Sequence, residues 1–199
     1  MLTTAKRVAR GLVQANYTLA FNQDDDSNER NFSREVTLDV FNLPAEYTYS
    51  KQDVRHKFDV SGVLDVTGGW TLGAILIARS GFPYTAVIGS DQQRDANDDN
   101  DRAIINGHVS ARNGFRQPNF LNLDLRVMKA FAIGRRRVDL IAEVFNATRA
   151  PNQHFGNDSI SVFGTTASPV ATAGQPLFAP STARFGGPRQ VQLGARLTF

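Results

Sequence analysis

Strict alternation of apolar and polar residues at the C-terminal end restricts the fold of this chain more than any other feature. The apolar positions are Val191, Leu193, Ala195, Leu197 and Phe199, and the positions between them are Gln190, Gln192, Gly194, Arg196 and Thr198. A strand directs successive side chains to opposite faces, so one face of this segment is apolar and the other is polar. A segment of about 10 residues that ends on an aromatic side chain fits a tilted membrane-spanning strand. A half-buried strand of a soluble sandwich shows the same alternation, so both interpretations remain open at this point.

Five further segments repeat the alternation. Strands are therefore expected near residues 9–21, 56–66, 70–79, 120–131 and 137–146, in addition to 189–199. No segment shows a convincing helical stripe with a period of about 3.6 residues. The sequence predicts an all-β chain of about six strands.

The connections between the expected strands alternate between short and long. The short ones fall at residues 67–69 and near 132–135, and the long ones cover roughly residues 22–54, 82–118 and 147–187. Loops of that length are uncommon in compact domains. In an antiparallel transmembrane β-barrel the periplasmic turns are short and the extracellular loops are long. With the C-terminus at the periplasm, all three long loops lie outside, which favours the barrel over a soluble sandwich.

Composition excludes several other classes of protein. The chain has no cysteine, so it has neither disulfides nor thiolate metal sites. Its 22 basic and 19 acidic residues leave a net charge of +3, too small and too dispersed to indicate nucleic-acid binding. No apolar run approaches the about 18 residues of a membrane helix. The mean hydropathy of −0.29 is compatible with a barrel, whose lumen and loop residues dilute its apolar face.

The charged residues of the polar faces fit a water-filled lumen. They are Asp59, Asp65, Asp124, Arg126, Asp139, Glu143 and Arg196. A Lys or Arg on the lipid side at the bilayer centre costs about 2–4 kcal/mol, so these charges are expected to point inward. Residues such as Asp124, Arg126, Glu143 and Arg196 are expected to form structural ion pairs with neighbouring strands or with a plug. No nucleophile elbow, phosphate loop or paired histidine ligands occur, and we expect no enzyme, no catalytic residue and no cofactor.

Five segments occur in an order that resembles a known family. They are Asp53-Val-Arg-His-Lys-Phe58, Ser80-Gly-Phe-Pro-Tyr-Thr85, Asn119-Phe-Leu-Asn-Leu-Asp-Leu-Arg126, Glu143-Val-Phe-Asn146 and Gln192-Leu-Gly-Ala-Arg-Leu-Thr-Phe199. Together they resemble the C-terminal barrel of TonB-dependent outer-membrane receptors, especially the Oar-like type with a carboxypeptidase-regulatory-like domain. The resemblance covers nearly the whole chain.

The resemblance implies a function in the outer membrane of a Gram-negative cell. The family's barrel has about 22 strands around an N-terminal plug domain. Residues 1–199 match about its last quarter, with no segment that matches the plug. Such a receptor takes up a scarce extracellular ligand, here unknown. Its expected partners are outer-membrane lipid, the barrel-assembly machinery and, only through the absent N-terminal part, the TonB complex. The alternative is an outer-membrane adhesin or surface-binding barrel without transport.

The ends of the chain lead to two further expectations. Residues 1–7 lack the apolar stretch of a secretory signal, so an exported barrel requires sequence upstream of Met1. We expect a fragment of a larger gene product or a reading frame truncated at an internal Met. About six strands leave two unpaired edges, which hydrocarbon does not tolerate. The isolated chain is therefore not expected to insert as a functional pore.

Two groups of residues are candidate sites. Asp95, Asn97, Asp99 and Asp101 place oxygen ligands at alternate positions, like the start of a Ca²⁺ loop. The Gly and the final Glu of such a loop are absent, so a structural Ca²⁺ competes with a simply solvated loop. Leu193, Ala195, Leu197 and Phe199 resemble the signal that the barrel-assembly machinery reads. The alternative is that Phe199 only anchors the strand in the interface, and both roles are compatible. For His56, at a strand start, a packing or interfacial role is favoured over catalysis.

Overall fold

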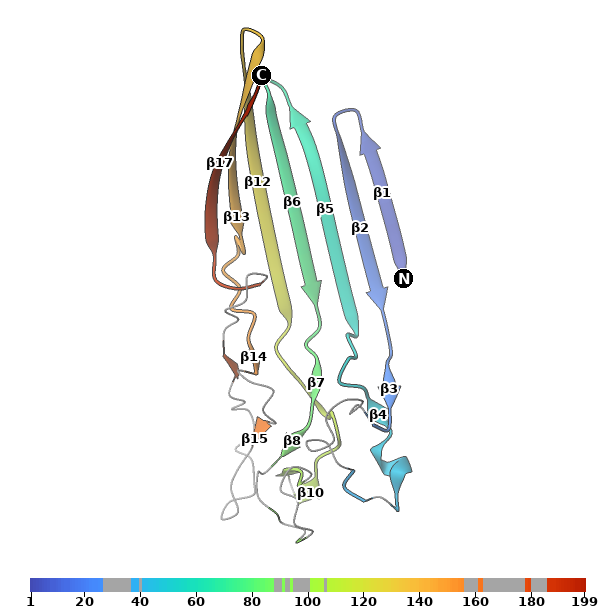
Figure 1. The fold of residues 1–199 in the computed structure, drawn as a ribbon. Helices are drawn as coiled ribbons and strands as arrows, with labels where there is room; N and C mark the ends of the chain where they lie inside the picture. The colour runs from blue at the N-terminus through green and yellow to red at the C-terminus, as the bar shows by residue number, and fades with distance from the viewer. Residues whose placement is uncertain are drawn as a thin grey trace.

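One antiparallel sheet of seven long strands dominates the computed structural model. The model describes residues 1–26, 37–39, 41–87, 91, 94, 101–105, 107–155, 161–162, 178–179 and 186–199. The long strands are β1 (Leu2–Val8), β2 (Gly11–Leu19), β5 (His56–Val66), β6 (Trp70–Arg79), β12 (Phe120–Ile133), β13 (Arg136–Phe145) and β17 (Gln190–Thr198). They lie in the order β1-β2-β5-β6-β12-β13-β17, so each long strand pairs with the long strand next to it in sequence. The sheet is open, with β1 and β17 at its edges (Figure 1). The predicted all-β, antiparallel class is confirmed.

Short turns gather at one end of the sheet and long connections at the other (Figure 1). The turns join β1 to β2, β5 to β6 and β12 to β13, and the C-terminus lies at the same end. Gly68 and Gly69, in the turn between β5 and β6, have φ of 75° and 81°, a region that glycine adopts without steric cost. The predicted alternation of short and long connections is therefore present in the structure.

The expected single strand near residues 9–21 is in fact part of a hairpin. β1 pairs with β2 from Leu2 opposite Tyr17 to Val8 opposite Gly11, and the turn consists of Ala9 and Arg10. β1 was missed because it does not alternate: Thr4 and Lys6 occupy the parity that is apolar elsewhere. The turn also lacks the Gly or Asn that usually marks a hairpin. The sheet thus has seven long strands in place of about six.

The register keeps most apolar residues of the long strands other than β1 on one surface, here called the apolar face. Val60 pairs with Leu76, and Leu76 pairs with Leu123. Many of these side chains are exposed: Phe58, Leu64, Leu72, Leu125, Val127, Leu140, Val191, Leu193 and Leu197. Among the described residues no second layer covers them, since the other sheets have only two strands each. A soluble sandwich needs such a layer to bury its apolar face.

The opposite surface, here called the polar face, carries the alternate residues of the same strands. Gln14 pairs with Ser61, and Arg126 pairs with Glu143. The apolar exceptions on this face include Leu12, Val63, Ile75, Ile77, Met128, Ile141 and Phe145. The sheet therefore has the two-sided pattern of a wall between an apolar and an aqueous medium.

The long connections contain short strands and one short helix. These are β3 (Gln23–Asp24), η1 (Leu43–Glu46), β4 (Thr48–Tyr49), β7 (Pro83–Tyr84), β8 (Ala86–Val87), β9 (Ile104–Ile105), β10 (His108–Val109), β11 (Phe115–Arg116), β14 (His154–Phe155), β15 (Ser161–Val162) and β16 (Phe178–Ala179). The buried hydrophobic residues of the described chain, Tyr84, Ala86, Val87 and Ala103, also lie here. In the part of the chain that the structure describes, no helix has the length and apolar character to span a membrane.

Candidate functional site

Charged side chains on the polar face are held in ion pairs between and along strands. Arg126 Nη1 lies 3.4 Å from Glu143 Oε1, across the β12–β13 pair. The carboxylate of Asp139 is buried and accepts hydrogen bonds from Arg137 Nε at 2.6 Å and from Arg196 Nη2 at 2.7 Å. The prediction of structural pairs with neighbouring strands is confirmed for Arg126, Glu143 and Arg196, and the structure adds Asp139 as the partner of Arg196.

Two other predicted inward charges bond within their own hairpins. Lys57 Nζ lies 3.3 Å from Asp59 Oδ2 on β5, and Thr71 Oγ1 donates to Asp65 Oδ1 at 2.7 Å across the β5–β6 turn region. Asp124 Oδ1 instead accepts the backbone N–H of Asn146 at 2.9 Å. These contacts neutralise or solvate the carboxylates locally, which suits a structural role.

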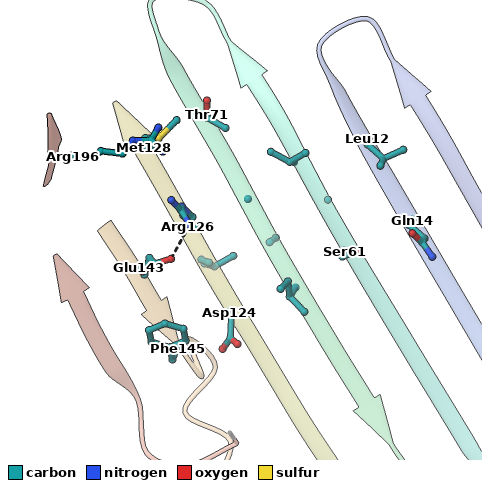
Figure 2. A pocket seen from close by; sticks show the side chains of 16 residues that line it. Leu12, Gln14, Ser61, Thr71, Asp124, Arg126, Met128, Glu143, Phe145 and Arg196 are labelled. Atoms are coloured by element: carbon teal, nitrogen blue, oxygen red, sulfur yellow. Dashed lines mark ion pairs between the residues drawn. The ribbon is translucent and has the colours of Figure 1, made fainter. Parts of the chain in front are cut away.

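A hollow of about 600 Å³ lies against the polar face (Figure 2). Its lining comes from six long strands and includes Leu12, Gln14, Ser61, Thr71, Asp124, Arg126, Met128, Glu143, Phe145 and Arg196. Figure 2 shows the Arg126–Glu143 pair at its side, with Asp124 and Phe145 close by. Within the described residues no group of three or more His, Asp or Glu side chains is arranged to hold a metal ion. The hollow therefore offers mixed polar and apolar contacts.

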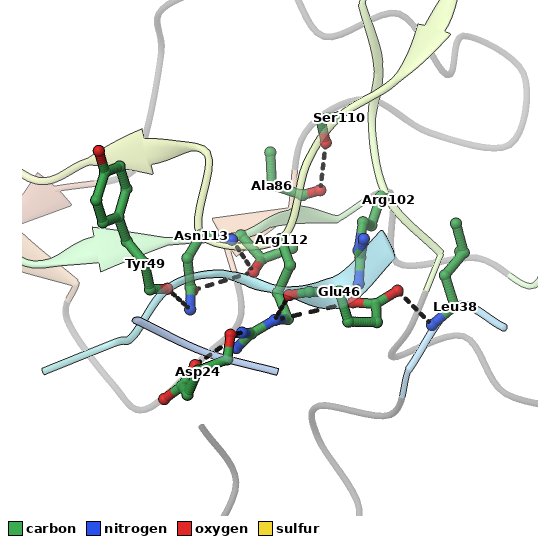
Figure 3. A network of polar contacts seen from close by, with 10 residues as sticks. Asp24, Leu38, Glu46, Tyr49, Ala86, Arg102, Ser110, Arg112 and Asn113 are labelled. Carbon is green, nitrogen blue, oxygen red and sulfur yellow. Dashed lines mark hydrogen bonds and ion pairs between the residues drawn. The ribbon is translucent and has the colours of Figure 1, made fainter. Parts of the chain in front are cut away.

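At the end of the sheet that carries the long connections, a buried ionic network joins two of these connections (Figure 3). Glu46, at the end of η1, forms an ion pair with Arg102, and both side chains are almost fully buried. Arg112 Nε donates to the backbone oxygen of Glu46 at 3.0 Å, and its Nη2 lies 2.7 Å from Asp24 Oδ1. Buried charges are costly unless paired and hydrogen-bonded, and this arrangement meets that requirement.

Asn113 adds a neutral bridge to the same network. Its Nδ2 donates to the backbone oxygen of Tyr49 at 2.8 Å, and its own N–H donates to Thr85 Oγ1 at 2.9 Å. Its φ is 50°, a left-handed conformation that Asn tolerates better than most residues. Described parts of the two long connections are thus tied together, and we call the residues of this network the loop cap: Asp24, Glu46, Tyr49, Thr85, Arg102, Arg112 and Asn113.

A second ionic centre lies where the loop cap meets the strands. Asp53 is fully buried; it accepts the N–H of Asn22 at 2.8 Å and is paired with Arg116. Burial raises the pKa of the Asp53 carboxyl, but the hydrogen bonds from Arg116 and Asn22 and the charges of Arg116 and Arg55 outweigh it and hold the pKa below its ordinary value. Arg55 stacks over the rings of Phe21 and Tyr49, 4.1 and 4.6 Å from their centroids.

The segments that carry the family resemblance contact one another at this junction. His56 N donates to Ser80 Oγ at 3.0 Å, and Gly81 N donates to Asn119 Oδ1 at 3.2 Å. A Cβ on Gly81 would lie 1.7 Å from the backbone oxygen of Gln117, so only glycine fits. His56 Nδ1 also lies 2.8 Å from Tyr17 Oη, in agreement with the expected packing role.

The structure describes the C-terminal candidate site fully and the Ca²⁺-loop candidate only in part. Asp95, Asn97 and Asp99 lie outside the described residues, while Asp101 is buried beside the loop cap. The Ca²⁺ loop stays a prediction. Leu193, Ala195 and Leu197 lie on β17 opposite Ala142, Leu140 and Val138. Leu193 and Leu197, like Phe199 beyond the strand, are exposed on the apolar face. Their recognition by the assembly machinery also stays a prediction.

Sequence reasoning missed the residues that organise the loop cap. These residues lie in polar stretches with no local motif, and they are Glu46, Asp53, Arg102, Arg112 and Arg116. Their partners are remote: Arg102 and Glu46 are 56 positions apart, and Arg112 and Asp24 are 88 apart. No periodicity signals such contacts.

The fold defines a class of protein: an antiparallel wall with one exposed apolar face, one ion-paired polar face, short turns at one end and long, interlocked loops at the other. A family model described as an outer membrane beta barrel domain matches residues 1–111, which include β1 to β10. The chain belongs to this outer-membrane β-barrel family. Comparisons with curated proteins and with solved structures gave no match.

Proposed function

We propose that this chain is the C-terminal part of the wall and loops of a TonB-dependent receptor that takes up a scarce ligand across the Gram-negative outer membrane. The observation that carries the proposal is the loop cap, built on the end of the sheet opposite the short turns. In an outer-membrane barrel short turns are periplasmic, so the loop cap faces the cell exterior. Membership of the outer-membrane β-barrel family supports the location, and the five resembling segments support the finer assignment.

The loop cap suits ligand capture because buried ion pairs and hydrogen bonds connect its residues without a ligand. Glu46 and Arg102 are buried together, and Arg112 connects Glu46 to Asp24. A preorganised surface avoids the entropy cost of ordering loops on binding. The same network distinguishes this end from a set of independent, solvated loops.

The contacts between the resembling segments also support the assignment. Asp53, His56, Ser80, Gly81 and Asn119 belong to three of those segments, and all lie at the junction of strands and loops. Residues that resemble a family motif and also hold one another are less easily explained as chance matches. In this proposal the polar-face carboxylates serve ion pairing in the wall rather than enzymatic chemistry.

The test begins with the coding sequence upstream of Met1. The proposal expects a signal peptide, a plug domain and a TonB box, and the full-length product should bind the periplasmic domain of TonB in a pull-down from detergent extracts. Ligand uptake by cells should depend on TonB and on the proton-motive force. A signal peptide followed by only a few more strands would sink the transporter. Surface binding that is retained without TonB and without uptake would favour the adhesin.

A further inference from the structure

We propose that the periplasmic end of the apolar face carries a site for anionic glycerophospholipids, in which Lys129 and Arg136 each face the phosphate of a headgroup. Trp70, Phe131 and Phe199 frame the site. The inference rests on the membrane placement given under the proposed function and adds a specific lipid to it. No other basic side chain of β6, β12, β13 or β17 combines this face with this end of the sheet.

The register places both cations on the apolar face. Lys129 pairs with Trp70 of β6 and with Leu140 of β13. Two positions further along the strands, Val127 pairs with Ala142 on the same face. Arg136 pairs with Ile133, next to the β12–β13 turn. Both residues therefore lie on the surface that faces lipid, within the last rows before the short turns.

Aromatic rings hold both cations against this surface. Lys129 Nζ lies 4.9 Å from the centroid of the Trp70 ring and 5.5 Å from that of Phe131. The Arg136 guanidinium carbon lies 5.3 Å from the centroid of the Phe199 ring. Such cation–π contacts orient a charge at an interface, where the rings rest on acyl chains and the charge reaches the headgroups.

Neither cation is matched by a carboxylate side chain within the described chain. The nearest acidic residues in register, Asp139 and Asp65, point to the polar face, where Asp139 is held by Arg137 and Arg196. Lys129 Nζ donates one hydrogen bond, to the backbone oxygen of Gly68. An ammonium has three donors, so two remain for another acceptor.

A lipid phosphate satisfies this demand better than other partners. A Lys or Arg on the lipid-facing side costs about 2–4 kcal/mol at the bilayer centre but about 0–1 kcal/mol near the interface, which fits cations beside the short turns. The leaflet on that side carries glycerophospholipids. An anionic headgroup offers acceptor oxygens and a net charge that a zwitterionic headgroup lacks, and Lys129 and Arg136 provide opposite charge at headgroup depth.

Trp70 is the only tryptophan of the chain, so its fluorescence reports this site alone. The full chain is placed in bicelles of phosphatidylcholine, whose acyl chains are available to the apolar face. Phosphatidylglycerol or further phosphatidylcholine, with brominated acyl chains in either case, is then added at an equal small mole fraction. Bromine quenches a nearby indole, and each reading is normalised to the same lipid without bromine.

We expect the quenching of Trp70 to correspond to a local concentration of brominated phosphatidylglycerol about 5-fold higher, for each cation, than that of brominated phosphatidylcholine. This preference should weaken as salt is added. In the doubly substituted variant Lys129→Gln with Arg136→Gln the preference should vanish, while Lys129→Arg should keep it. The matched control is Lys57→Gln, because Lys57 lies on the polar face beside Asp59. Far-ultraviolet circular dichroism verifies that each variant keeps its strand content.

Two outcomes would overturn the inference in different ways. Equal quenching by the two lipids, or a preference that persists in the double variant, removes the phosphate site and leaves the lipid-facing wall intact. No quenching by either lipid shows that Trp70 does not face lipid, which also removes the membrane placement.

Discussion

Arg196 on β17 donates to the buried carboxylate of Asp139 on β13, with Nη2 2.7 Å and Nε 3.1 Å from Oδ2. Arg137 completes the pair of guanidinium donors on the same carboxylate. On the polar face this contact ties the last strand to β13, its neighbour in the sheet of described strands. On the apolar face the same strand presents exposed Leu193 and Leu197.

Replacing Asp139 with Asn should loosen β17. The variant loses the charge that Arg137 and Arg196 share and leaves two cations facing each other across the strand pair. We expect faster amide hydrogen exchange in β17 than in β5, measured in micelles. Asp65→Asn is the control, since Asp65 accepts one hydrogen bond from Thr71 and is exposed. Equal exchange in the two variants would contradict the role of Asp139.

Replacing Glu46 with Gln should open the loop cap. It leaves the buried guanidinium of Arg102 without its carboxylate partner, which costs about 3–5 kcal/mol of local stability. Amides that bond within the cap, such as those of Ala103 and Ser110, should then exchange faster, while those of β5 and β6 stay protected. In the control Glu143→Gln the pair with Arg126 is partly exposed, and the expected loss is below about 1 kcal/mol.

The contact of Asp53 with Asn22 should survive mild acid. Since the pKa of Asp53 in the folded chain is below its ordinary value of 3.8, the carboxylate stabilises the fold fully above that value. This stabilisation is lost as the pH falls through the lower pKa of the folded state. The amide proton shift of Asn22, followed by NMR from pH 7 downward, should move only below the ordinary value. In the variant Asp53→Asn this transition of the Asn22 amide shift should be absent. A transition above pH 3.8 in the unsubstituted chain would be inconsistent with the ion pair.

Replacing Gly81 with Ala should destabilise the strand–loop junction by about 1–3 kcal/mol, because the new methyl overlaps the backbone oxygen of Gln117 and forces a backbone shift. The hydrogen bond from Gly81 N to Asn119 Oδ1 lies in the region that must move. Denaturant unfolding in micelles provides the measurement. Gly73→Ala is the control, since a Cβ there meets its nearest neighbour, the Cβ of Arg126, at 3.6 Å. Similar midpoints for the two variants would show that Gln117 adjusts freely.

Removing the ring of Phe199 should slow assembly of the full-length product into membranes. In a reaction with purified barrel-assembly machinery in vesicles, Phe199→Ala is expected to lower the rate of formation of the protease-protected form. The control is Phe41→Ala, whose ring is 96% exposed in a long loop. An unchanged rate for Phe199→Ala would leave interfacial anchoring as the role of this ring.

The sequence predicted the wall better than the loop cap because the two are encoded at different ranges. The faces of β12 follow from a local alternation, Leu121, Leu123 and Leu125 against Asn122 and Asp124, and the register preserves it. The alternation did not predict β1, because Thr4 and Lys6 interrupt it. The position of β1 is set instead by its pairing with β2.

The loop cap depends instead on contacts that no local pattern encodes. Arg112 and Asp24 are 88 positions apart, and they meet because the antiparallel hairpin β5–β6 places the two connections at the same end of the sheet. The charges on the polar face were foreseen as paired, but their individual partners required the register, which aligns Arg126 with Glu143 and Asp139 with Arg196.

The division between short turns and long connections sets where the chain can change length. Doubling the length of a flexible loop adds only about 0.6 kcal/mol of closure entropy, so residues added outside the loop cap contacts leave the wall almost unaffected. One residue added inside β5 instead moves every following side chain of that strand to the opposite face. It would carry Asp59 to the lipid side if inserted just before it. Insertions between relatives should therefore collect in the long connections, and a scan of single-residue insertions would map the boundaries of the wall directly.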